Sequence, residues 1–376
     1  MAKKTMLLIL VLALMFTSSS CWDQKPIENQ AFIIGLALDK GKQPDKIMVT
    51  FQIAQPKAFI AESPADESFW NITEEADDIS TAQSQLANIM NWIPSFMHCQ
   101  VILIGEDLAR EGLHKYHDFI LRTHEVRRRL KVAVVQGKAK DILDMDFKSA
   151  LLPAFVVAEM MSQNIKYSYD LTDYMDVAEI HRADSEGFDF VLGRIIPMDN
   201  KIEMSGSGVF KNLKLVGWLS GEETMGVRFL QGNVGSGYLT VDLPEEFGDR
   251  AVLRVYEAHS RLEPELKGNK LYVRLKVRLE GDIQEIVNEK GKMNETVFLS
   301  TAQRLFEADL KEKIEHAFRK AQQEYESEPF GIKDKVKSYY PKYWKQHKDQ
   351  WEELYRSAKL EIEAKVLIRR IGEVNN

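Results

Sequence analysis

Long apolar segments, surplus positive charge and cysteine are all scarce in this sequence. After residue 21 no apolar run reaches the roughly 20 residues that a membrane-spanning helix requires. Its 50 basic residues are outnumbered by 57 acidic ones, which argues against a nucleic-acid-binding protein, because such proteins need a basic surface to neutralise phosphates. Only two cysteines are present, Cys21 and Cys99. The hydrophobic content of 44% is ordinary for a globular protein, and the length allows two or three domains.

Motifs that carry catalytic or cofactor chemistry are also missing. The sequence contains no phosphate-binding loop, no dinucleotide fingerprint, no Gly-x-Ser-x-Gly elbow and no His-Glu-x-x-His helix. The glycine-rich run 232–237 lacks the lysine and the following helix of a phosphate loop, so we interpret it as a turn between strands. We therefore expect no catalytic residue and no cofactor.

The best candidate for a metal site is the histidine group His114, His117 and His124. On a helix these residues would lie within roughly a quarter-turn of one another, which is the clustering that zinc needs. No cysteine or carboxylate completes the group, and arginines surround it, so a solvated polar face is the preferred interpretation. Several acidic residues have no identifiable partner and are interpreted as surface charge: Asp141, Asp144, Asp146, Glu222 and Glu223.

The first 20 residues have the order of an export signal. Lys3 and Lys4 precede the apolar run Met6–Phe16, and small residues follow before Cys21. The apolar run is too short to cross a bilayer as a helix. A cysteine at the cleavage point resembles that of a bacterial lipoprotein, in which the thiol takes a diacylglyceryl group. Two acyl chains suffice for stable anchoring, so Cys21 is the predicted lipidation site.

One position departs from the lipoprotein pattern. Leucine usually stands three places before the cysteine, whereas this chain has Ser18. Ser18 and Ser20 also suit an ordinary signal peptidase, so a soluble exported protein is the alternative. If Cys21 carries lipid, Cys99 has no partner for an intramolecular disulfide. Cys99 lies in the segment 97–104, which is typical of a strand entering a core, and is predicted to be a small buried hydrophobe.

The patterning predicts an α+β protein with three mixed α/β domains, in which antiparallel-rich sheets are flanked by helices. After the signal peptide at 1–20 we expect an N-terminal domain at 21–148, with strands near 31–38, 47–53, 69–73, 101–105 and 130–136. Helices are expected near 79–91, capped by Asp78 or Ser80, and near 113–125. A middle domain at 149–246 opens with a helix at 152–163, and its frequent glycines predict turn-rich β structure over 190–243.

The C-terminal domain is expected at 247–376, with a sheet and two long helices. Strict alternation predicts strands at 271–279 and 360–368. Ser300 or Thr301 is the predicted cap of the first helix, whose apolar stripe ends near Tyr325. Tyr340, Trp344 and Trp351 are placed on one face of the second helix and are predicted to pack on the sheet, with a membrane-interface patch as the alternative. The basic run 127–129 is interpreted as a solvated helix end, with contact to anionic lipid as the alternative.

Two long segments carry a resemblance to a known family. Together with Cys21-Trp22-Asp23 and the segment 35–39, these two segments resemble those of the Ger(x)C family. This family comprises the C-subunit lipoproteins of bacterial spore germinant receptors. The motifs keep their order along essentially the whole mature chain. They comprise Gly208-Val209-Phe210-Lys211, 214–219, Glu223-Thr224 with Gly226, Pro329-Phe330-Gly331, 340–344, Trp351 and 368–372.

The resemblance implies a non-enzymatic protein that its lipid holds on the outer face of the spore inner membrane. It also implies two integral-membrane partners, the A and B subunits, with which the protein would sense nutrients and start germination, and a fold of three α/β-type domains. The alternative function is an extracytoplasmic solute-binding lipoprotein of a transporter. Three unequal units with no two-lobe duplication count against that alternative, and an exported hydrolase is disfavoured because no nucleophile or metal motif is present.

Overall fold

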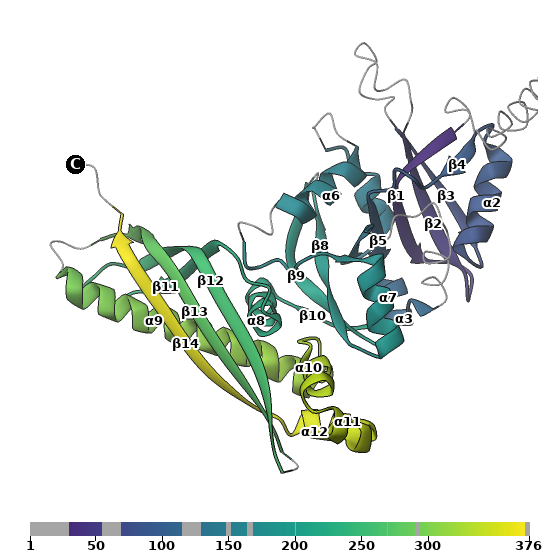
Figure 1. Cartoon of the computed structure of the whole chain (residues 1–376). Coiled ribbons are helices and arrows are strands. Elements are labelled where there is room, and N and C mark those ends of the chain that lie inside the picture. Colours follow the sequence, from purple (N-terminus) through teal and green to yellow (C-terminus); the bar gives the residue numbers. More distant parts are fainter. Residues whose placement is uncertain are drawn as a thin grey trace, which may run out of the picture.

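Two β-sheets organise the computed structural model (Figure 1). It describes residues 30–54, 69–114, 129–147, 152–163, 168–199, 201–268, 270–289 and 294–372. The predicted signal peptide and Cys21 lie outside the described residues, as do nearly all of the predicted helix at 113–125 and Arg127 and Arg128 of the basic run.

The larger sheet has the strand order β10-β9-β8-β6-β5-β1-β2-β3, with β4 paired to β1 and β7 to β6. Its central strands β1, β5, β6 and β8 are parallel neighbours, and antiparallel pairs extend the sheet on both sides. The central strands are buried on both faces, which is why 101–105 is apolar without alternation. The strands are β1 (Gln30–Lys40), β2 (Ile47–Ala54), β3 (Phe69–Ala76), β4 (Ile93–Ser95), β5 (Val101–Gly105), β6 (Lys131–Val135), β7 (Met175–Asp176), β8 (Phe190–Met198), β9 (Lys201–Lys211) and β10 (Lys214–Leu219).

Helices cover both faces of the larger sheet and make two separate apolar cores. On one face α2 (Ile79–Ile89), α3 (Glu106–Glu111) and α7 (Val177–Glu186) pack into one core. On the other face α5 (Ala139–Leu143) and α6 (Pro153–Gln163) pack into the second core. Asp78 caps α2 as predicted, and Ile79, Ala82 and Leu86 form its buried face, whereas Ile89 is 61% exposed.

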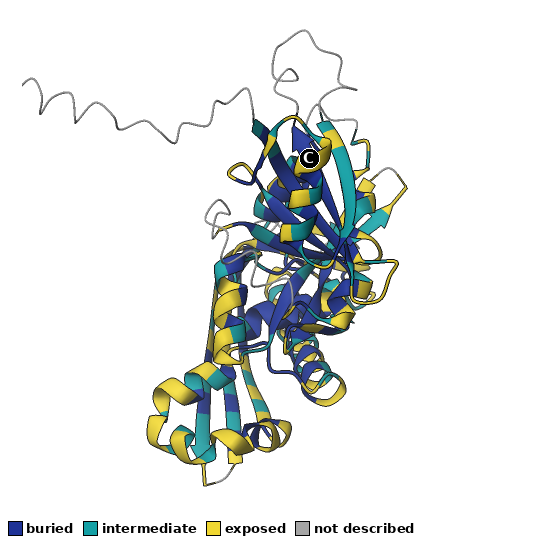
Figure 2. Cartoon of the chain, turned by 90° about the vertical axis from the view of Figure 1, so that its right-hand side faces the viewer, coloured by how far each residue is buried: buried dark blue, intermediate teal, exposed yellow. Residues whose placement is uncertain are grey.

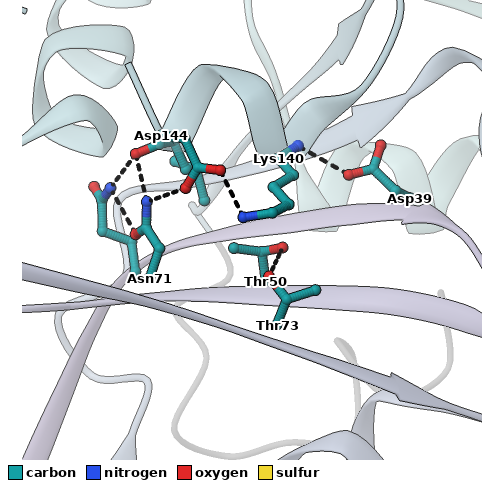
Figure 3. Close-up of polar contacts among 8 residues, drawn as sticks. Asp39, Thr50, Asn71, Thr73, Lys140 and Asp144 are labelled. Carbon is teal, nitrogen blue, oxygen red and sulfur yellow. Dashed lines mark hydrogen bonds and ion pairs between the residues drawn. The ribbon is translucent and has the colours of Figure 1, made fainter. Parts of the chain in front are cut away.

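Polar contacts fix α5 at the carboxyl end of β1 (Figure 3). The Asp39 carboxylate accepts hydrogen bonds from the backbone N–H groups of Ala139 and Lys140, at 2.7 and 2.8 Å. Burial raises the pKa of Asp39 although both hydrogen bonds oppose the rise. A Cβ at position 105 would lie 2.0 Å from the Asp39 carboxylate, so the position requires glycine. These contacts hold the carboxyl ends of β1 and β5 and the start of α5 together.

The smaller sheet has the order β11-β12-β13-β14, from β11 (Gly237–Asp242), β12 (Arg250–Lys267), β13 (Lys270–Val287) and β14 (Lys359–Ile371). Helix α9 (Glu295–Arg319) runs along one face and continues into a π-helical turn, η5 (Lys320–Glu324). Figure 2 shows the buried residues concentrated in the strands, with exposed residues on the outward sides of helices. The alternating strands at 271–279 and 360–368 are confirmed.

Three expectations for the C-terminal and middle regions were wrong. Helix α9 begins after Asn294, whose side chain accepts the Val297 N–H, and not at Ser300 or Thr301. The second long helix is three short ones, α10 (Ile332–Tyr339), α11 (Pro341–His347) and α12 (Trp351–Arg356), joined between α11 and α12 by a 3₁₀ turn, η6 (Lys348–Gln350). Pro341 breaks the pattern because proline cannot continue a preceding helix.

The third correction concerns α8 (Gly221–Gln231), which lies within the segment expected to be turn-rich β structure. Gly232 takes a left-handed conformation, with φ of 83°, and ends α8, so the run 232–237 connects a helix to a strand. Helix α7 was missed as well. Each helix begins with a capping box, at Asp176–Glu179 and at Ser220–Glu223, which is a signal that the sequence contains.

The mixed α+β class is confirmed. The larger sheet includes strands from both the expected N-terminal and middle domains, because β8, β9 and β10 continue from β6 without a break in hydrogen bonding. The expected boundary at 148 therefore lies between elements of one sheet, and β11 from the expected middle domain joins the smaller sheet. The division into three domains stays a prediction.

Candidate functional site: the junction between the two sheets

The first family-like segment lies in β9, β10 and α8, where the two sheets meet. This helix packs against α9, β9, β10 and β12, and every residue from Glu223 to Leu230 is buried. An amphipathic surface helix would leave one face in water. Helix α8 is instead a structural connection between the larger sheet and the C-terminal region (Figure 1).

Glycines allow unusually close contacts in this junction. A Cβ at Gly226 would lie 2.6 Å from the Cβ of Ala317 and 2.7 Å from the Lys313 carbonyl oxygen, so α8 and α9 touch backbone to backbone. A Cβ at Gly217 would lie 2.2 Å from the Tyr325 ring. The Tyr325 hydroxyl donates to the Trp218 carbonyl at 2.8 Å, which ties the end of η5 to β10.

Glu223 is the central charged group of the α8–α9 contact. Its carboxylate accepts the backbone N–H of Ser220 and pairs with the Lys320 ammonium, which lies 2.9 Å from each oxygen. Burial alone would raise the pKa of Glu223, but these contacts and nearby His316 outweigh burial and lower it. The expectation of surface charge holds for exposed Glu222 and is wrong for Glu223, which is 7% exposed.

A second carboxylate, Glu328, organises the start of α10. It accepts the backbone N–H groups of Phe330, Ile332 and Lys333, at 2.9 to 3.0 Å. The N–H of Glu328 donates in turn to Asp189 at 2.9 Å, directly before β8 of the larger sheet. The hydrogen bonds therefore run from the larger sheet through Asp189 and Glu328 into α10.

Burial, with a smaller contribution from the neighbouring Asp189 carboxylate, raises the pKa of Glu328 to about 7 although the three N–H donors oppose the rise. Burial also raises the pKa of Asp189. Two buried carboxylates that share a hydrogen-bonded segment cannot both ionise at low cost, because each charge is desolvated and repels the other. The junction consequently contains a group that titrates near neutral pH.

This pKa leads to a prediction about stability. Because the folded value of about 7 exceeds the ordinary value of 4.5, the folded state binds more protons than the unfolded state between these values. The free energy of unfolding should therefore fall by about 3 kcal/mol as pH rises from 4.5 to 7. Glu328→Gln should remove that fall, measured as the difference between variant and wild type in urea unfolding at several pH values. Glu326→Gln, at an exposed neighbour, is the control, and an unchanged pH profile in Glu328→Gln would contradict the assignment.

A cavity of about 290 Å³ lies beside these carboxylates, with Asp189, Lys211, Glu328, Lys333 and Trp351 among its lining residues. Two lysine side chains form hydrogen bonds across the junction, at the rim of this cavity. Lys211 on β9 donates to the Glu326 carbonyl at 2.8 Å, and Lys333 on α10 donates to the Gly187 carbonyl at 2.6 Å. These hydrogen bonds thus join β9 to the segment before α10 and the end of α7 to α10 itself.

The structure does not assemble the candidate metal site from its described residues. His114 hydrogen-bonds to the Asn212 carbonyl at 2.9 Å, and His117 and His124 lie outside the described residues. Among the residues that the structure describes, no group of histidine, cysteine and carboxylate side chains is arranged to hold a metal ion. In the same part of the chain, no helix has the length and apolar character to cross a membrane.

Two interpretations of single residues are confirmed. Cys99 is 4% exposed, and burial raises the pKa of its thiol to about 12, which is the environment of an unreactive cysteine. Trp351 is buried, and Tyr340 and Trp344 pack against the same core from partly buried positions. The three residues do not share one helix face as predicted, because Tyr340 lies between α10 and α11, Trp344 on α11 and Trp351 on α12. Asp141, Asp144 and Asp146 are exposed, as expected.

Comparison with known families covers nearly the whole chain. Residues 23–196 match the family described as "Spore germination protein N-terminal domain", and residues 205–372 match "Spore germination B3/GerAC like, C-terminal". The chain belongs to the Ger(x)C family of spore germination proteins. The gap between the two matched regions, residues 197–204, covers the end of β8, the turn and the start of β9, which are antiparallel partners in one sheet. In this Ger(x)C protein the C-terminal region therefore contributes β9 and β10 to the sheet of the N-terminal region.

Two relatives match over nearly their full length at low identity. The spore germination protein YndF of Bacillus subtilis is 24% identical, with 98% of this chain and 96% of the relative covered. The spore germination protein B3 of the same organism is 23% identical, with 94% of each chain covered. The crystal structure of the GerBC protein matches with a TM-score of 0.59 at 19% identity and covers 91% of this chain and 99% of its own, which shows a shared fold.

Proposed function

We propose that this Ger(x)C protein is a non-enzymatic, lipid-anchored subunit of a nutrient germinant receptor. It works with integral-membrane A and B subunits to start spore germination, and its diacylglyceryl anchor is on Cys21. The observation that carries the proposal is the match of both family regions, which together extend from residue 23 to residue 372. The names of the relatives, all spore germination proteins, support the process.

The position of Cys21 suits an anchor on the outer face of the spore inner membrane. Nine peptide units separate Cys21 from Gln30, the first residue of β1. Fully extended, they span at most about 32 Å. A lipid on Cys21 would therefore keep the central strand β1 close to the bilayer, where membrane subunits are within reach. Two acyl chains provide the affinity that stable attachment requires.

The junction is suited to transmit a change from one region to the other. Helix α8, Glu223 and Glu328 connect the larger sheet to the C-terminal region through buried contacts, so the two regions move as one unit or exchange between discrete arrangements. A subunit of this kind acts by contact with partners and needs no catalytic residue.

The test is nutrient-triggered germination of spores that carry wild-type protein, a deletion or Cys21→Ala. We expect both altered strains to lose the response to one nutrient set, with complete loss in the deletion, and to germinate normally with a non-nutrient trigger. Loss of refractility measures the response, and membrane fractionation measures anchoring. Cys99→Ala, at a buried thiol, is the matched control for the loss of a cysteine.

Different outcomes separate the proposals. If the deletion responds normally in a strain without paralogues, the receptor function is wrong and solute binding by the purified protein becomes the next test. If the deletion fails while Cys21→Ala responds and remains in the membrane fraction, the receptor function stands and the anchor at Cys21 is wrong.

A further inference from the structure

The outer face of the smaller sheet carries two adjacent rows of basic residues. Strand register places His259, Arg278 and Lys365 directly opposite one another on β12, β13 and β14. In the next row Arg261 lies opposite Lys276. All five are exposed, and we call them the basic rows. Helix α9 covers the other face of this sheet, and Figure 1 shows no described helix over the face of the basic rows.

This arrangement is unfavourable for the isolated protein. Like charges directly opposite on neighbouring strands destabilise a sheet, whereas opposite charges stabilise it. Three of the five are partly compensated, because His259 contacts Glu257 at 2.9 Å, Arg261 contacts Glu263 at 2.8 Å and Arg278 contacts Glu280 at 2.6 Å. Among the described residues Lys276 and Lys365 form no ion pair, although Glu363 lies opposite Lys276 on β14. The basic rows also contrast with a chain whose net charge is −7. An anionic ligand would relieve the repulsion.

The surface at the basic rows is hollow. A depression of about 680 Å³ is lined by Lys276, Arg278, Lys365 and Glu363 on the sheet. Gly232 and Val234, which follow α8, complete its wall. A hollow receives a protruding segment, whereas a planar bilayer would touch only its rim. Residues two apart on one strand are separated by about 6.6 Å, so Lys276 and Arg278 match carboxylates at alternate positions of an extended chain.

We propose that the basic rows form a docking site for an extended acidic segment of a partner protein, with carboxylates at alternate positions. Glu363, opposite Lys276, interrupts the positive charge and fixes which positions of the segment can be acidic. The preference for a protein over the bilayer rests in part on the proposed anchor, because β1 and the strands β12, β13 and β14 lie on opposite sides of the molecule in Figure 1.

Binding of a fluorescent peptide with glutamate at alternate positions tests this proposal, with the full-length protein in detergent micelles. Wild type should bind the peptide in a salt-dependent manner, measured by anisotropy. The double variant Lys276→Glu/Lys365→Glu should bind about tenfold more weakly or worse. The matched control is Lys342→Glu/Lys345→Glu, the same charge change at exposed positions on α11, and it should bind as wild type does. Circular dichroism verifies that both variants fold.

Three results would overturn the proposal. One is the absence of peptide binding by wild type, and another is equal weakening by the two double variants, which would indicate a net-charge effect only. In the third, wild type binds phosphatidylglycerol vesicles and not the peptide, and Lys276→Glu/Lys365→Glu abolishes the vesicle binding. This face would then be a lipid-binding surface. None of these results depends on germination, so the receptor function is tested separately.

Discussion

Gly226→Val should lower the free energy of unfolding by about 3 kcal/mol or more, because overpacking of this kind cannot relax. The new Cβ would meet the Cβ of Ala317 at 2.6 Å and the Lys313 carbonyl oxygen at 2.7 Å. Both are at or near the backbone of α9, so no side-chain rotation can remove the clash. Helices α8 and α9 would have to separate, which would open the core that they share. Urea unfolding of the purified variant measures the loss.

Gly235→Val is the control for this substitution. Nothing lies within 4 Å of a Cβ at that position, and its backbone φ is outside the left-handed region. The variant should stay within about 0.5 kcal/mol of wild type, as surface substitutions do. Equal stability of Gly226→Val and Gly235→Val would contradict the backbone contact between α8 and α9. Gly226→Ala should fall between the two, since alanine improves helix propensity by about 1 kcal/mol while it still clashes.

The sequence predicted strands well because their burial is periodic or continuous. Alternation in 271–279 fits a strand with one buried and one exposed face, and the apolar run 101–105 fits a strand buried on both faces. The structure contains both strands. Helix α8 was not predicted because it is buried on all sides and contains Gly221 and Gly226. Its sequence therefore shows neither an amphipathic stripe nor a high helix propensity. Its capping box, Ser220 with Glu223, was the available signal.

The charged junction could not be predicted, because its partners are far apart in the sequence. Asp189 and Glu328 are separated by 139 residues, and Glu223 and Lys320 by 97. Sequence distance gives no information about which carboxylate meets which ammonium group. The family-like motifs did mark the neighbourhood, since Glu223, Gly226 and the segment 329–331 lie in it. The motifs indicated important positions, while the contacts explain why these residue types are needed.

The order of the sheets was also beyond sequence reasoning. The expected boundary at 148 followed a change in composition, from mixed strands and helices to an apolar helix and then glycine-rich segments. Strands β6 and β8 pair across that change in composition, because the pairing of parallel strands depends on how both faces of the sheet are packed. Composition indicates what a segment can form, and the burial of its faces decides which sheet it joins.

Glu223→Gln should lower the free energy of unfolding by about 2 to 3 kcal/mol at neutral pH. Removal of one partner from a buried ion pair costs about 3 to 5 kcal/mol, and the smaller figure applies here because the Lys320 side chain is 21% exposed. Lys320→Met should lose less, since Ser220 and His316 still stabilise the carboxylate. The double variant should be more stable than the sum of the single losses predicts, which a double-mutant cycle in urea unfolding measures.

The pH dependence of Glu223 should be opposite in sign to that of Glu328. The pKa of Glu223 is lowered, so its stabilisation is present above its ordinary pKa of 4.5 and is lost as pH falls through the folded value. Glu223→Gln should therefore reduce the loss of unfolding free energy that occurs as pH falls below 4.5. Glu328→Gln should instead change the pH dependence between 4.5 and 7. Glu222→Gln, at the exposed neighbour, is the control and should cost at most about 1 kcal/mol. Equal effects of Glu222→Gln and Glu223→Gln on the free energy of unfolding would contradict a buried ion pair at Glu223.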